Sequence, residues 1–120
     1  MRKLLALLAI VVLTGFGCAT SPQTPAQGVY AVQGTYATAL TIAVAYKALP
    51  VCQQGAPVLC SQPSVVATLQ KADDAAFAAL TAAQNIARTP GAGANAQTAI
   101  VAAQQAVSAL TSITATLQVK

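Results

Sequence analysis

The chain has 120 residues, 56% of them hydrophobic and only 7% charged, with six basic residues against two acidic ones and no histidine. Nucleic-acid binding needs a stripe of basic side chains at the phosphates, and the scattered basic residues form none, so we exclude nucleic acid as a partner. Catalysis and metal binding draw mainly on His, Glu, Asp and Cys side chains. The two aspartates, at 73 and 74, point about 100° apart on a helix. We therefore predict that the protein is not an enzyme and that it binds no metal and no other cofactor.

A basic start, an apolar run and a cysteine among small residues open the chain. Two basic residues follow the first methionine, an apolar run covers 4–16, and Cys18 comes next between a glycine and an alanine. This order is typical of an export signal. The stretch 15–18 resembles a lipobox, the motif after which lipoprotein signal peptidase cuts. The resemblance implies that Cys18 becomes the lipid-modified first residue of a bacterial lipoprotein.

The same resemblance divides the N-terminal part of the chain. It implies a signal peptide over 1–17, followed by a lipidated N-terminus and a flexible tether over 18–26, where prolines lie among Ser, Thr and Gln. Ala19 after the cysteine, in place of aspartate, implies the outer membrane facing the periplasm. An ordinary signal peptidase that cuts after Ala19 is the alternative, and it would remove Cys18 and leave the protein without lipid.

Three stretches show helical periodicity, at about 27–49, 64–88 and 95–119. The predicted inward stripe of the first stretch is Val29, Tyr36, Leu40, Ala43 and Lys47. That of the second is Val66, Leu69, Asp73, Ala76, Leu80, Ala83 and Ala87, broadened by Val65 and Phe77. That of the third is Ile100, Ala103, Val107, Leu110, Thr114 and Leu117. Prolines and capping residues at the ends of these stretches support the bounds. We expect Pro50 to end the first helix. We expect Ser61 or Ser64 to cap the second, with Pro63 in its first turn, and Asn95 to cap the third.

These helices predict an all-α fold, a small antiparallel three-helix bundle over 27–120, because that arrangement buries all three stripes. The alternative is a long helical hairpin that completes its core by oligomerising. Frequent alanines on the stripes predict closely spaced helix axes. The uncharged segment 26–46 approaches the length of a membrane-spanning helix, but its glutamines and threonines make it weakly apolar, so we place it in the bundle.

Cys52 and Cys60 bracket the break between the first two predicted helices. In an exported protein a disulfide is the expected state of such a pair, and two thiols without His or Glu do not complete a zinc site. The loop also carries the apolar residues Val51, Ala56, Pro57, Val58 and Leu59. We expect them to fold back and close the end of the core. The alternative hypothesis is a preorganised contact site for a partner, formed by Val51, Pro57, Val58 and Leu59.

Asp73 is an acidic residue on an inward stripe. Counting outward from the expected disulfide places it opposite Tyr36, whose hydroxyl would donate a hydrogen bond to the carboxylate. We therefore predict a buried, satisfied polar pair that fixes the register of the first two helices, or an Asp73 carboxylate that reaches solvent. A role of Asp73 in binding a partner is the alternative.

Together these features predict a small lipid-anchored envelope protein with a structural or protein-interaction role. Its expected partners are the membrane, through the N-terminal lipid, and an envelope protein. Two other functions stay open. One is a soluble periplasmic binding module, and the other is a phage lysis or exclusion lipoprotein such as an outer-membrane spanin subunit.

Overall fold

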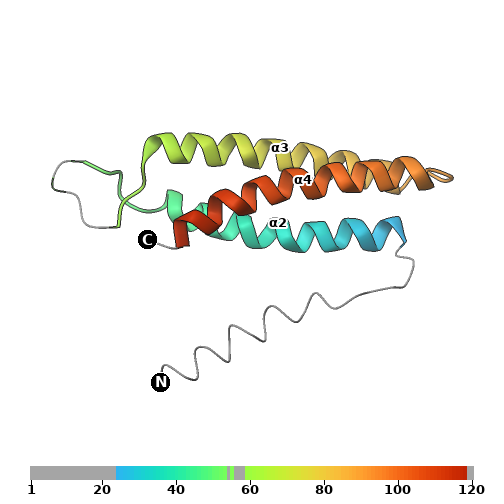
Figure 1. Ribbon diagram of the computed structural model, residues 1–120, viewed down its shortest axis with the longest axis horizontal. Coiled ribbons are helices and arrows are strands. Elements are labelled where there is room, and N and C mark those ends of the chain that lie inside the picture. The colour runs from blue at the N-terminus through green and yellow to red at the C-terminus, as the bar shows by residue number, and fades with distance from the viewer. Residues whose placement is uncertain (1–23, 54, 56–58, 119–120) are drawn as a thin grey trace, which may run out of the picture.

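Three antiparallel α-helices make up the described structure. The computed structural model describes residues 24–53, 55 and 59–118. Its helices are α2 (Pro25–Lys47), α3 (Pro63–Ala87) and α4 (Gly93–Gln118). Consecutive helices run in opposite directions, and each packs against the other two (Figure 1). The predicted all-α three-helix bundle is therefore confirmed, and the helices share one core within a single chain, unlike the oligomerising hairpin.

α2 begins two residues earlier than predicted because a capping box forms at its start. The backbone N–H of Gln27 donates to the Thr24 side chain, and the backbone N–H of Thr24 donates to the Gln27 side chain. These bonds satisfy two N–H groups that a helix start leaves without partners. Pro25 suits the first helical position, so residues 25 and 26, which were predicted to belong to the tether, lie in α2. The helix ends at Lys47, three residues before the predicted stop at Pro50.

α3 starts at Pro63, which occupies the first turn as predicted. The predicted caps are wrong. Gln62 is the N-cap and its side chain makes no capping hydrogen bond. The Ser61 hydroxyl instead donates to the carbonyl oxygen of Leu49, and Ser64 lies exposed inside the first turn. The start of α3 is thus fixed by the chain that precedes it rather than by a serine cap.

α4 also begins earlier than predicted. The backbone N–H of Ala96 donates to the carbonyl oxygen of Ala92 at 2.7 Å, so the helix is already formed upstream of Asn95. Asn95 therefore lies exposed within the first turn and is not the cap. Gly91, with φ of 76°, supplies the left-handed backbone that turns the chain from α3 into α4.

The core runs along the bundle axis and takes residues from all three helices. Its buried apolar members are Val29, Val32, Ala39, Ala43, Leu69, Ala76, Leu80, Ala83, Ile100, Ala103, Val107 and Leu110. The predicted stripe of α4 is buried from Ile100 to Thr114, and Leu117 is half-buried. Thr114 is tolerated there because its hydroxyl donates to the carbonyl oxygen of Thr111 at 2.9 Å.

Two predicted stripes need correction. In α2 the buried positions include Val32 and Ala39, which the predicted stripe omitted, whereas Lys47 is exposed. In α3 the predicted broadening at Val65 is present as a half-buried contact, but Phe77 is 60% exposed. Alanine and threonine cover much of the surface of α2, so its apolar face is weakly marked and packing against the other helices selects it.

Small residues bring the helices close together, as predicted. Ala76, Ala83 and Ala103 are fully buried. Gly28 of α2 lies so near α4 that a Cβ atom there would stand 3.1 Å from Cδ1 of Ile100. The absence of a side chain at Gly28 therefore permits this close approach of α2 to α4.

Of the helices in the described ranges, α4 alone has the length and hydropathy of a membrane-spanning segment, with a mean hydropathy of 1.3 over an 18-residue stretch within Gly93–Leu117. From the sequence, the segment considered as a possible membrane-spanning helix was the first predicted helix instead. α4 is the helix whose stripe is buried against both neighbours, and core helices commonly reach this hydropathy.

Candidate functional site

The disulfide lies at the end of the bundle where α2 passes to α3. Cys52 and Cys60 are joined with an S–S distance of 2.01 Å and Cα atoms 4.9 Å apart. This confirms the predicted pairing. The bridge joins the segment that follows α2 to the segment that precedes α3 at this end of the bundle (Figure 1). Both cysteines are half-buried, so the bridge itself forms part of the surface at this end.

A second set of interactions holds the base of the loop. The buried Ser61 hydroxyl donates to the carbonyl oxygen of Leu49 at 2.9 Å, and the Ser61 backbone N–H donates to the carbonyl oxygen of Pro50 at 2.8 Å. The backbone N–H of Cys52 donates to the carbonyl oxygen of Ser61 at 3.0 Å. These bonds form a short bridge between the two chain segments, so the base of the loop is held by hydrogen bonds as well as by the disulfide.

Tyr46 ties this base to the helices. Its hydroxyl oxygen accepts a hydrogen bond from the backbone N–H of Gln62 at 2.9 Å, directly before α3. Sequence inspection had assigned Tyr46 no particular role. Its position near the end of the first predicted helix was the available signal, because the antiparallel second helix begins beside that end and its free N–H groups can donate to a phenol oxygen.

The apolar residues of the loop do not all behave as predicted. Val51 is 53% exposed and Leu59 is 65% exposed. The expectation that they fold back to close the core is therefore wrong for these two. Val51 takes part in the bridge with Ser61, and Leu59 directly precedes the disulfide-bonded Cys60. Pro57 and Val58, which shared the same prediction, lie outside the described residues, as does Ala56.

A groove lies beside the loop, between the ends of α2, α3 and α4, with a volume of about 540 Å³. Its apolar lining consists of Leu49, Leu59, Val65, Ile113 and Leu117, and Tyr46 and the disulfide complete the wall. Sequence inspection missed Ile113. It precedes the stripe residue Thr114 by one position, and only the arrangement of the helix ends brings it beside the loop. The end of the bundle thus combines a rigid apolar rim with an open groove.

The predicted polar pair is present near the middle of the bundle. The Tyr36 hydroxyl donates to Oδ1 of Asp73 at 2.7 Å, and both side chains are half-buried. Burial, together with the hydrogen bond to the Asp73 carboxylate, raises the pKa of Tyr36 from 10.0 to about 12. This bond links α2 to α3 at one register. The contact is satisfied internally, so it supports the structural interpretation of Asp73.

Cys18, the proposed lipid attachment site, lies outside the described residues. Among residues 24–53, 55 and 59–118, no group of three or more His, Cys, Asp or Glu side chains gathers to hold a metal ion. Comparison of the chain with known protein families, curated proteins and solved structures gives no match. The function is therefore argued from the sequence pattern and the geometry of the bundle.

Proposed function

We propose that this chain is a small lipid-anchored protein of the bacterial envelope, with a structural or protein-interaction role and no enzymatic activity. The observation that carries the proposal is the disulfide between Cys52 and Cys60. Such bonds persist in oxidising compartments such as the periplasm. Pairing these two cysteines leaves Cys18 as the third, at the position that resembles a lipobox.

The disulfide-closed end of the bundle supports the interaction role. Val51 and Leu59 are large apolar side chains held in water on a crosslinked loop, next to an apolar groove. Exposed apolar residues grouped in this way are typical of contact sites. Because the disulfide crosslinks the two ends of the loop, a partner would meet part of the usual entropic cost of ordering it already reduced. We infer that an envelope protein binds at this end.

Intact-mass measurement of the mature protein tests the anchor. The proposal expects a chain that begins at Cys18 and carries a diacylglyceryl group and an N-acyl group. The Cys18→Ser variant should remain unprocessed, with the mass of the full precursor and no acyl group. Its matched control, Cys52→Ser with Cys60→Ser, should still mature and carry lipid. A mature chain that starts after Ala19 and lacks lipid would instead establish the soluble periplasmic alternative.

Site-specific photo-crosslinking in the envelope tests the interaction surface. A photoreactive amino acid at Leu59 should give a discrete adduct with an envelope protein. The same amino acid at Gln105, an exposed position on α4 away from the loop, serves as the control and should not give that adduct. Loss of the disulfide should weaken the adduct. Identical adducts at both positions, or none at Leu59, would contradict a partner site at this end.

A further inference from the structure

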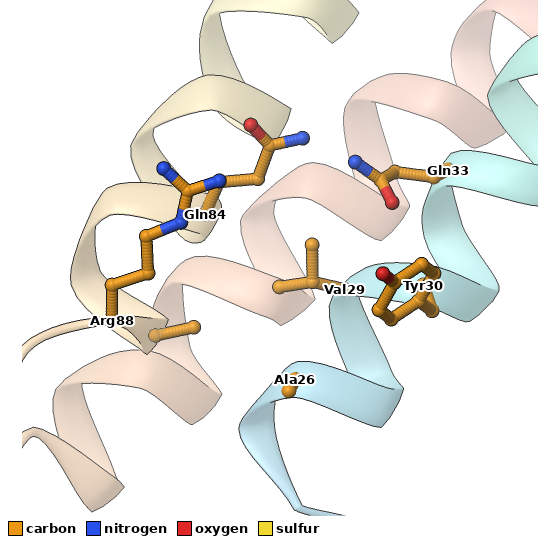
Figure 2. A pocket seen from close by; sticks show the side chains of 7 residues that line it. Ala26, Val29, Tyr30, Gln33, Gln84 and Arg88 are labelled. Carbon is orange, nitrogen blue, oxygen red and sulfur yellow. The ribbon is translucent and has the colours of Figure 1, made fainter.

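A second surface lies at the opposite end of the bundle, in a pocket of about 200 Å³ between the start of α2 and the end of α3. Figure 2 shows Arg88 and Gln84 of α3 on one side and Gln33 of α2 on the other, with Val29 between the helices. Val29 and Ala87 give the pocket an apolar floor. The rim of the pocket therefore offers hydrogen-bond donors from one guanidinium and two amides, and its floor is apolar.

The charges at this pocket favour an anion. Arg88 is its one charged lining residue. The two acidic side chains of the chain are Asp73 and Asp74, and Asp74 precedes Arg88 by 14 positions, or about 21 Å along a helix. No carboxylate therefore competes for the guanidinium at this end of the bundle. A guanidinium with neighbouring amide donors suits the oxygen atoms of a phosphate.

The position of the pocket identifies the source of that phosphate. Under the proposed function, on which this inference rests, lipid is attached at Cys18, and seven residue steps lead from there to Pro25. An extended chain of that length spans at most about 25 Å, so the start of α2 is held near the membrane. α2 has 23 residues and is about 34 Å long, which places the disulfide-closed loop at the far end. The tethered end is thus the end that carries the pocket.

Tyr30 strengthens this assignment. It lines the same pocket, and 75% of its surface is exposed. Tyrosine is enriched where proteins meet the headgroup layer, since its ring is apolar and its hydroxyl is polar. We propose that this pocket receives the phosphate of an anionic phospholipid headgroup, with Arg88 and the amides of Gln33 and Gln84 as donors and Tyr30 at the lipid surface. The bundle then stands with its disulfide loop directed away from the membrane.

Tryptophan fluorescence tests the orientation, because the chain has no native Trp. Mature lipidated protein carrying Tyr30→Trp is reconstituted into vesicles of phosphatidylcholine and phosphatidylglycerol that contain a headgroup spin label. The indole at position 30 should be strongly quenched and blue-shifted. Leu59→Trp, at the far end and equally open to solvent, is the matched control and should stay unquenched. Equal quenching at both positions, or none at position 30, overturns the inference.

The role of Arg88 is tested in the Tyr30→Trp protein. Arg88→Gln should reduce quenching about fivefold in vesicles with phosphatidylglycerol and leave it unchanged in phosphatidylcholine alone. Lys47→Gln removes the same charge at the other end and should have no effect. Loss of quenching with neither variant, or with both, contradicts the assignment. A fluorescence response of the vesicle-free protein to millimolar inorganic phosphate would make the pocket a free-phosphate site and overturn the lipid assignment.

Intact-mass measurement distinguishes failure of the lipid anchor from failure of the headgroup contact alone. If the mature protein carries no acyl groups, the proposed anchor fails, and the headgroup assignment fails with it. If the protein is acylated but position 30 is not quenched, the anchor stands and only the headgroup contact is wrong.

Discussion

Removal of the disulfide should lower the stability of the bundle without dissolving its helices. The perturbation is Cys52→Ala combined with Cys60→Ala, or reduction of the native protein. The two cysteines are eight positions apart. For a loop of that length, the chain-entropy estimate gives about 2.5 kcal/mol from restriction of the unfolded chain. For a domain of this size that corresponds to a melting temperature lower by about 10–20 °C.

The helical signal should survive because the loop has a second attachment. The bonds of Ser61 to Leu49 and Pro50 still join the chain segments that follow α2 and precede α3. The three stripes that fill the core lie outside the loop. Circular dichroism at 222 nm should therefore show near-native helix content at 25 °C for the reduced protein, and a lower midpoint on heating or in urea.

The urea slope separates the disulfide from the hydrogen bonds beside it. Without the crosslink the unfolded chain expands, so the m-value should rise in the double cysteine variant. Ser61→Ala keeps the disulfide and should cost about 1 kcal/mol with an unchanged m-value. An unchanged midpoint after reduction, or collapse of helix content at 25 °C, would refute this division of roles.

Three further outcomes are expected from the core and the helix contacts. Leu110→Ala should cost about 2–5 kcal/mol in urea unfolding because the side chain is fully buried, whereas exposed Gln105→Ala should stay within about 0.5 kcal/mol. Gly34→Ala should stabilise the protein by about 0.5–1 kcal/mol because nothing lies within 4 Å of the added Cβ, and Gly28→Ala should gain less because its Cβ would meet a core side chain at 3.1 Å. Between pH 10 and about 12 the folded state should hold a phenol proton that the unfolded chain has lost, so stability falls with rising pH, and Tyr36→Phe should remove that part of the decline.

A specific experimental result would contradict each of these three predictions. Equal losses for the Leu110 and Gln105 variants would mean that α4 does not face the core as described. A larger gain at Gly28 than at Gly34 would mean that α2 and α4 lie further apart. An alkaline decline that is the same with and without the Tyr36 hydroxyl would show that its bond to Asp73 is absent in solution.

The sequence alone determined where the helices lie to within a few residues. Prolines at 50 and 63 and the glycines near 91 interrupt the chain, and apolar residues recur at steps of three and four between these breaks. It also determined the disulfide, because only two cysteines bracket the break between helices. The Tyr36–Asp73 contact followed from counting residues outward from that bridge.

The helix starts were less accurate because caps involve side chains outside the helical pattern. Thr24 caps α2 from within a stretch whose prolines indicate a linker, and Gln62 begins α3 with no side-chain signal. The exposure of Phe77 and the burial of Ala39 were likewise hidden. In a helix covered with alanine and threonine, every face is nearly equally apolar, so periodicity does not select one.

Tertiary structure alone decided which helix faces pack together and which residues gather at the two ends of the bundle. Leu59 is largely exposed beside the disulfide, and Ile113 borders the same groove because three helices end beside that loop. Likewise, Arg88 and Tyr30 line one pocket although 58 positions separate them in the chain. Local sequence sets the propensity of each segment, but contacts between distant segments depend on the packing that satisfies all three helices at once.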